Sequence, residues 1–273
     1  MHVSAMNLHY RWYPFQRFLD DVERLGLHHI ELWGGSPHFN SDDISYREVR
    51  KFRKTFEERD LTLVCHTPEQ CMYPINIASD YPAMRGRSIE YCKKNIDIAS
   101  DLGAPLMLVT PGTGYVNEDT SLVWDRSRDA LMELALYAQE ADLQLGLEVL
   151  RGDESTIIHS VSALRQMVDE VDSSHLGGIL DTIPMAINGE TPKEYCNALK
   201  EKLFHIHFID GTPYLHLAWG DGFLDVQSYL VQLSDNGYTG ALSLEITDHR
   251  YLANPEEALE KSLGVLFRYL KHE

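Results

Sequence analysis

The chain has 273 residues, 44% of them hydrophobic and 24% charged, which is an ordinary composition for a globular protein that buries a sizeable core. Its 42 acidic residues outnumber 24 basic ones and give a formal net charge of −18, a field that repels phosphate backbones and argues against nucleic acid as a partner. No apolar run approaches the roughly 20 residues of a membrane span, and the first residues lack the basic-then-apolar layout of a signal peptide, so we expect a cytoplasmic protein with no membrane association.

Strand-like apolar runs alternate with amphipathic helical stretches along the whole chain. The first strand is expected at 2–6 and the first helix at 14–26, where Pro14 suits a first helical turn and Gly26 suits a helix end. The expected strands lie at 2–6, 28–34, 61–67, 105–112, 143–150, 176–182, 203–210 and 240–247. The expected helices lie at 14–26, 46–60, 81–102, 121–141, 156–171, 191–201, 226–237 and 255–273.

The order of these elements predicts the fold class. The strands are nearly continuous apolar runs, as is typical of a parallel sheet that helices cover on its outer face. Eight strand-then-helix units in 273 residues fit a single (β/α)8 TIM barrel spanning 1–273, with no length left for a second domain. A doubly wound open sheet is the alternative, but its glycine-rich phosphate turn is missing after the first strand.

Polar residues interrupt the apolar runs near the strand ends, where barrel enzymes carry their chemistry. These residues are Glu31, Trp33, His66, Glu148, Asp181, His205, His207 and Glu245. Carboxylates brought together at one barrel mouth repel one another unless a cation lies between them. Three carboxylates and one imidazole, from strands five to eight, form a hard ligand set suited to one octahedral divalent ion. We expect Mn²⁺, Mg²⁺ or Co²⁺ at Glu148, Asp181, His207 and Glu245.

Simpler interpretations exist for each residue alone. An acidic residue at a strand end is more often a helix cap or a surface carboxylate than a metal ligand. His66 is expected to line the site, and Trp33 to form an apolar wall around a substrate or to pack at the rim. His205 is expected to support the site or contact the substrate, although a hydrogen-bonded core histidine would fit its position equally.

Several segments resemble a known family over essentially the full length. They are "IELWGGSPHF" at 30–39, "TPEQCMYPINIAS" at 67–79, "LEVLRGDES" at 147–155, and "HIHFID" at 205–210 with the later "WGDG" at 219–222. The chain resembles the sugar isomerase/epimerase branch of the xylose-isomerase-like barrels, which includes ketose 3-epimerases acting on tagatose and psicose. This resemblance implies the same quartet of metal ligands.

The resemblance also implies an activity. Glu148 and Glu245 would act on opposite faces of the substrate, one removing the C3 proton of a ketose and the other returning a proton, through a metal-stabilised enediolate. Glu154 matches a substrate-binding glutamate, and His216 falls where family members carry an Arg or His that contacts substrate oxygens. The implied substrate is a fructoselysine-like ketose derivative or a free ketohexose. Relatives of this kind are commonly dimers or tetramers, so we expect a homo-oligomer.

One departure and three competing functions remain open. Hexose 3-epimerases carry a histidine three residues after the strand-six aspartate, whereas this chain has Pro184. A sugar isomerase or an inosose-type dehydratase would share every metal ligand. An apurinic-site endonuclease would need several metal ions and a basic surface, which the net charge opposes. A non-catalytic sugar-binding barrel is the last alternative.

Overall fold

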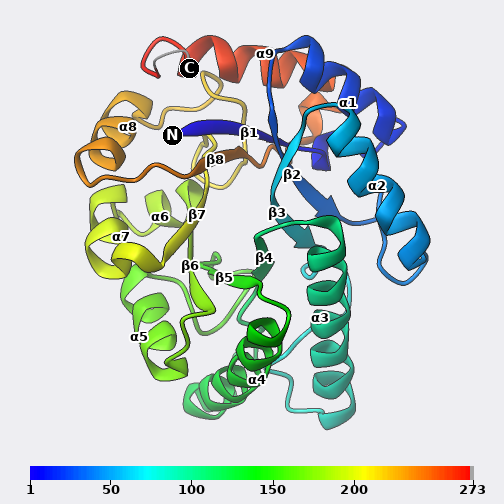
Figure 1. Cartoon of the computed structure of the whole chain (residues 1–273). Helices are drawn as coiled ribbons and strands as arrows, with labels where there is room; N and C mark the ends of the chain where they lie inside the picture. The colour runs from blue at the N-terminus through cyan, green and yellow to red at the C-terminus, as the bar shows by residue number, and fades with distance from the viewer. Residues whose placement is uncertain (271–273) are drawn as a thin grey trace.

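The computed structural model of the chain describes residues 1–270, whose eight parallel strands close into one barrel (Figure 1). Neighbouring strands along the chain are neighbours in the sheet, and β1 pairs with β8 to close the ring. The strands are β1 His2–Met6, β2 His29–Gly34, β3 Thr62–Pro68, β4 Leu106–Val109, β5 Gln144–Glu148, β6 Leu176–Asp181, β7 Leu203–His207 and β8 Ala241–Leu244. The predicted (β/α)8 TIM barrel is confirmed.

The helices surround the strands as a ring (Figure 1). They are α1 Phe15–Arg24, α2 Tyr46–Glu58, α3 Pro82–Leu102, α4 Thr120–Glu140, α5 Val161–Val171, α6 Thr182–Ile187, α7 Pro192–Leu199, α8 Val226–Asp235 and α9 Pro255–Leu266. Short 3-10 helices are η1 Leu8–Tyr10, η2 Lys200–Lys202 and η3 His249–Tyr251.

Some predicted boundaries are wrong for identifiable reasons. The helix expected from residue 156 begins only at Val161, because the Ser160 hydroxyl caps it by accepting from the Ala163 amide. Several strands end earlier than expected, because the chain turns into loops once it leaves the closed barrel. The short α6 was not predicted, and it begins where the Asp181 carboxylate caps its first turn. The expected last helix runs to 273, of which 271–273 lie outside the described residues.

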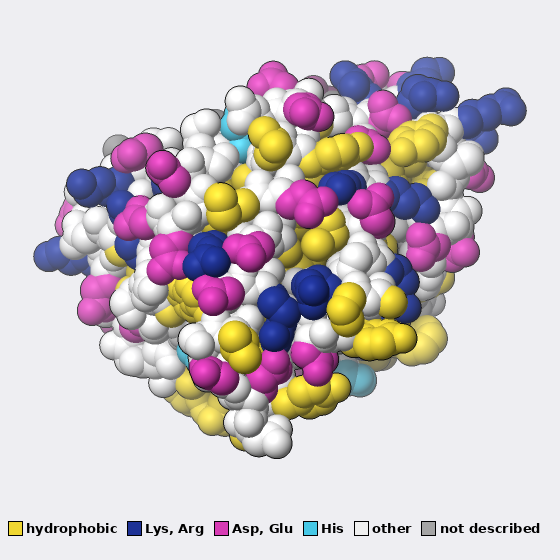
Figure 2. Space-filling view, turned by 90° about the horizontal axis from the view of Figure 1, so that it is seen from below, with side chains coloured by type: hydrophobic (Ala, Val, Ile, Leu, Met, Phe, Trp, Pro, Cys, Tyr) yellow, Lys and Arg dark blue, Asp and Glu magenta, His cyan; other side chains and the backbone are white. Residues whose placement is uncertain are grey.

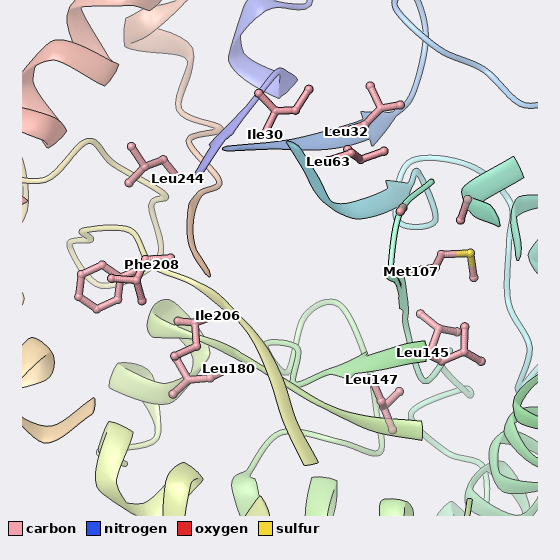
Figure 3. Close-up of a cluster of buried hydrophobic side chains, with 14 of the residues drawn as sticks. Ile30, Leu32, Leu63, Met107, Leu145, Leu147, Leu180, Ile206, Phe208 and Leu244 are labelled. Carbon is pink, nitrogen blue, oxygen red and sulfur yellow. The ribbon is translucent and has the colours of Figure 1, made fainter. Parts of the chain in front are cut away.

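The main core lies between the barrel and its helices. Alternate strand residues point outward into this layer, and Figure 3 shows such side chains around the ring of strands, including Ile30, Leu147 and Leu180. The barrel interior is smaller, and it holds a separate apolar group of Cys65 and Ile179 with neighbouring leucines. Because the outward side chains are large and aliphatic, the strands have the continuous apolar character noted above.

The outer surface mixes charges of both signs. Figure 2 shows acidic and basic side chains interspersed over one face of the described chain. On α4, for example, the Arg128 guanidinium lies 2.7 Å from the Asp125 carboxylate and 2.9 Å from that of Asp129. Within residues 1–270, no helix is both long enough and apolar enough to cross a membrane.

Gly177 of β6 allows close packing beside β7. A Cβ atom at Gly177 would lie 2.4 Å from the Lys202 carbonyl oxygen and 2.6 Å from the Phe204 ring. We therefore expect Gly177→Ala to destabilise the protein by about 1–3 kcal/mol, measured by urea unfolding, because the nearest obstacle is backbone. As a control, Gly264→Ala on α9 meets no atom within 4 Å and is expected to stabilise by up to ~1 kcal/mol. Equal effects of both variants would contradict the packing argument.

Candidate metal centre and cavity

The four predicted metal ligands meet at the carboxyl ends of the last four strands. Glu148, Asp181 and His207 are the final residues of β5, β6 and β7, and Glu245 directly follows β8. One possible ligand atom from each residue lies within 4.8 Å of those of the other three. His207 Nδ1 is at the centre, 2.7 Å from Glu148 Oε1 and 3.1 Å from Glu245 Oε2. The structure thus brings together four possible metal ligands from the ends of four separate strands.

These donor atoms fit a cation better than they fit one another. Glu148 Oε1 and His207 Nδ1 are buried, yet neither makes a hydrogen bond of good geometry. Asp181 uses Oδ1 to accept the Ile183 amide at 2.7 Å, which leaves Oδ2 facing the centre. Unsatisfied buried donors and acceptors are rare in proteins. Three carboxylates and an imidazole nitrogen turned to one point form a ligand set that can hold a divalent ion.

The buried carboxylate of Glu31 fixes His207 from below. His207 Nε2 lies 3.0 Å from Glu31 Oε1, and His205 Nε2 lies 2.8 Å from Glu31 Oε2. Thr67 Oγ1 donates a further hydrogen bond to Glu31 Oε1. Glu31 is fully buried, and the two imidazoles hold the pKa of its carboxyl well below the ordinary value against the opposing effect of burial. Because an ionised carboxylate only accepts, His207 donates through Nε2 and presents Nδ1 to the quartet.

Ligand atoms of Glu31, Cys65 and His205 also lie close together inside the barrel. We do not assign a second metal site to them, because the Glu31 oxygens already accept three hydrogen bonds. Burial also raises the pKa of the Cys65 thiol well above its ordinary value, so this sulfur is protonated and is a poor metal ligand. The Glu31 network is therefore a support for the quartet above it.

The pKa values of the protein groups reflect burial and crowding. Burial raises the pKa of Glu148 to about 8 and that of Asp181 to about 6, in both cases against the attraction of a nearby histidine. Burial has the same tendency at Glu245, but His207 and His216 outweigh it and lower this pKa to about 2. Burial would lower the pKa of His207, whereas the surrounding carboxylates, Glu245 first, raise it well above the ordinary value. The three carboxylates of the quartet therefore strongly favour a positive charge between them.

His216 reaches the quartet from the long loop after β7. Its Nδ1 lies 3.2 Å from Glu245 Oε2 and its Nε2 lies 3.6 Å from Asp181 Oδ2. Burial tends to lower the pKa of His216, but these carboxylates raise it to about 9. A protonated His216 therefore bridges two of the four quartet residues from the cavity side.

The Asp210 carboxylate holds this loop in place. It is buried and accepts four backbone amides, from Gly211 and Leu224 on Oδ1 and from Gly220 and Gly222 on Oδ2, at 2.8–3.0 Å. The backbones of residues 210 and 217 also pair as an isolated bridge. The Trp219 indole lies beneath the loop and donates to the Phe208 carbonyl at 2.9 Å. The position of His216 is thus fixed by a carboxylate six residues earlier in the chain.

A cavity of about 290 Å³ opens above the quartet. Its wall includes Glu148 and Glu245 with His216, whereas Asp181 and His207 lie beneath it. Glu154 also lines the cavity, and its carboxylate pairs at 2.8 Å with the Arg151 guanidinium. The volume is near the lower end of the range for small-molecule sites.

The remaining predicted residues occupy different positions. Trp33 lines the cavity with its indole nitrogen bonded to Glu69 at 2.9 Å. His66 is fully buried beside Asn95, and burial lowers its pKa to about 4. Neither His66 nor His205 is among the described residues that line the cavity. Pro184 is buried in α6, where the missing amide of a proline is tolerated in a first helical turn.

Sequence reasoning missed several residues that matter here. Glu31 was noted at a strand end, but its contact with His207 crosses the barrel and no local pattern reports it. Arg151 lies within a segment used for the family resemblance, and the spacing of Arg151 and Glu154 by three residues could have suggested their ion pair. Asp210 was placed in the histidine-rich segment without a role.

Fold and site together define a (β/α)8 barrel with a polar, metal-capable centre at the carboxyl ends of its strands. The chain belongs to the xylose isomerase-like TIM barrel family, whose model matches residues 19–269.

The chain is similar to several known proteins. It is 26% identical over 260 residues to fructoselysine 3-epimerase of Shigella flexneri, covering 93% of this chain and 94% of that protein. Its fold matches the crystal structure of a D-tagatose 3-epimerase-like protein with a TM-score of 0.80 at 20% identity, covering 98% of this chain and 99% of the other. It also matches IOLI protein with a bound zinc atom, with a TM-score of 0.82 at 17% identity and full coverage of both chains. Epimerases are isomerases, so the predicted enzyme class is confirmed at the level of these relatives.

Replacing Glu31 tests its support of the metal centre. We expect Glu31→Gln to lower the affinity for a divalent ion about 10- to 100-fold, because the neutral amide no longer fixes the orientation and protonation of His207. Titration calorimetry with Mn²⁺ measures the change. Glu69→Gln makes the same substitution on the cavity wall away from the quartet and is expected to leave the affinity unchanged. An unaltered affinity in Glu31→Gln would refute the supporting role.

Replacing Asp210 tests the anchoring of the His216 loop. We expect Asp210→Asn to destabilise the protein by about 2–5 kcal/mol, because its amide nitrogen would face two buried backbone donors and leave them unsatisfied. Urea unfolding measures this change. The matched variant Asp225→Asn removes the same charge at the exposed cap of α8, where asparagine caps as well as aspartate, so little loss is expected.

Proposed function

We propose that this protein is a divalent-metal-dependent epimerase that inverts C3 of a ketose or ketose derivative. The observation that carries the proposal is the pair Glu148 and Glu245. Both belong to the metal-capable quartet, and both also line the cavity. Inverting a carbon atom requires a proton acceptor on one face and a proton donor on the other, and these two carboxyl groups would take those positions. The similarity to fructoselysine 3-epimerase supports the same activity.

The two glutamates divide the proton transfers. The hydrogen on C3 lies next to the C2 carbonyl and is only weakly acidic, so the base must be held close to it. The two epimers present that hydrogen on opposite faces of the substrate. Each glutamate is therefore the base for one epimer and the acid for the other, and the direction of turnover decides which role it takes.

Four residues would hold the ion: Glu148, Asp181, His207 and Glu245. A divalent ion bound there would supply Lewis-acid chemistry that withdraws charge from the oxygen atoms beside the reacting carbon. Three carboxylates and one imidazole favour Mn²⁺, with Mg²⁺ and Co²⁺ as alternatives, since zinc prefers more nitrogen or sulfur ligands.

The other cavity groups would position the sugar. His216 is protonated beside Glu245 and can donate to a substrate oxygen from the loop side. Glu154, oriented by Arg151, offers a carboxylate acceptor for sugar hydroxyls. Trp33 presents an apolar wall against which a sugar ring or chain can pack, and such a wall excludes water from the reacting carbon. Pro184 has no side-chain donor or acceptor for a substrate hydroxyl, whereas a histidine at this position would have one.

Solvent exchange tests the reaction directly. In D₂O with Mn²⁺, we expect the wild-type protein to place deuterium at C3 of the substrate, as followed by NMR. Glu148→Gln and Glu245→Gln should each lose epimerisation by about 10²- to 10⁴-fold, because glutamine cannot transfer the proton. Each variant should still exchange the C3 hydrogen of one epimer, and the two variants should differ in which epimer they exchange.

Metal content of the variants, measured alongside, separates loss of the ion from loss of the proton acceptor. Deuterium only at C1 would establish an aldose–ketose isomerase instead, and loss of water from an inosose would establish a dehydratase. Turnover without metal, or binding of sugars without any exchange, would refute the proposal.

A further inference from the structure

One cation on the cavity wall has no acidic partner. Arg11 follows η1, its side chain is partly buried, and it lines the cavity above the quartet. Among the described residues, its guanidinium makes neither a hydrogen bond nor an ion pair. It also borders an outer hollow beside Trp12 and Tyr13, so it stands at the rim of the cavity and solvent or a ligand can reach it.

The other arginine on the wall differs sharply. Arg151 lies 2.8 Å from the Glu154 carboxylate and 3.2 Å from that of Asp153, and it also donates to the Tyr214 carbonyl at 2.8 Å. Each of its three guanidinium nitrogens therefore faces an oxygen atom of the protein. A chain with 42 acidic and 24 basic residues could readily supply a partner for Arg11, yet no acidic residue within 1–270 pairs with it.

The barrel order places Arg11 away from Glu148. Arg11 follows β1 and Glu148 ends β5, and these strands are four places apart in a closed ring of eight. They therefore belong to opposite sides of the mouth. His249, which follows β8 beside β1, also lines the cavity on the Arg11 side. A ligand that reaches from the quartet to the rim would end at these two basic side chains.

We propose that Arg11 recognises an anionic group, a carboxylate or a phosphate, at the end of the substrate remote from the reacting carbon. The inference rests on the proposed epimerase function and narrows its substrate to acidic ketose derivatives. A planar guanidinium with free donors matches either oxyanion in a two-point contact, whereas a neutral sugar end would leave the charge unused. The Glu148 carboxylate belongs to the opposite side of the mouth and would repel the same anion, which orients the substrate with its charged end toward Arg11.

Binding to the Mn²⁺-loaded protein, measured by titration calorimetry, tests this assignment without requiring turnover. The carboxylate probe is fructose joined at C1 to 6-aminohexanoate, and its matched control is the corresponding carboxamide. The phosphate probe is fructose 6-phosphate, matched to fructose. We expect one anionic probe to bind about 10- to 100-fold more tightly than its uncharged partner, and which of the two pairs responds identifies the oxyanion.

Variants assign the preference to Arg11. Arg11→Gln should abolish it and leave the uncharged probes within about twofold, and Arg11→Lys should retain part of it because the charge remains without the planar contact. Arg50→Gln, which removes an exposed charge from α2, should behave as the wild-type protein. The preference should also weaken as salt concentration rises.

Three outcomes would overturn the proposal. Equal affinity of charged and uncharged probes in the wild-type protein would exclude anion recognition. An equal loss for all probes in Arg11→Gln would make Arg11 a general contact or a structural residue. Failure of the proposed function appears differently, as absence of C3 deuterium exchange with every ketose, and failure of all probes to bind would overturn both.

Discussion

The carboxylates packed around His207 set the arrangement of side chains at the carboxyl end of the barrel. This one imidazole touches carboxylates on both of its nitrogens, with Glu31 below and Glu148 and Glu245 above. Buried carboxylates at such separations repel one another strongly unless positive charge lies between them. Protonation of the imidazole, whose pKa the carboxylates raise, can supply that charge, and a divalent ion bound at Nδ1 would supply it instead. Fold and chemistry are coupled at this point, because every strand end that carries a donor is fixed by barrel closure.

The support of this centre comes from two layers with different origins. Below it, the Glu31 network lies wholly inside the barrel, where side chains from β2 and β7 meet across the interior. Above it, the loop after β7 is outside the sheet and has little regular structure, so it needs its own anchor. Four backbone amides that donate to the Asp210 carboxylate provide this anchor. They fix the backbone of the loop that carries His216.

The sequence predicts best what depends on short-range periodicity. Continuous apolar runs predict the parallel strands. The metal-ligand quartet can then be predicted as well, because closure of the barrel brings the strand ends together whichever side chains lie between them. Contacts that join distant segments leave no such pattern, which is why the role of Glu31 is evident only in the structure. His66 and His205 look alike in the sequence as polar residues near strand ends, yet His66 bonds to Asn95 of α3 and His205 to Glu31 inside the barrel. Both are buried, and neither lines the cavity.

The proposed function gives one small site two tasks, proton transfer and recognition of an anionic group, and the charges on the cavity wall would keep them apart. Proton transfer requires carboxyl groups near the reacting carbon, and those groups disfavour any anion beside them. Recognition of a charged substrate therefore has to take place at a distance, on the part of the wall that other strands provide. A closed barrel allows this separation, because β1 and β5 contribute loops to opposite sides of one mouth. Under the proposed function, substitutions in the β1 loop would then change which ketose is bound without disturbing the residues that move its proton.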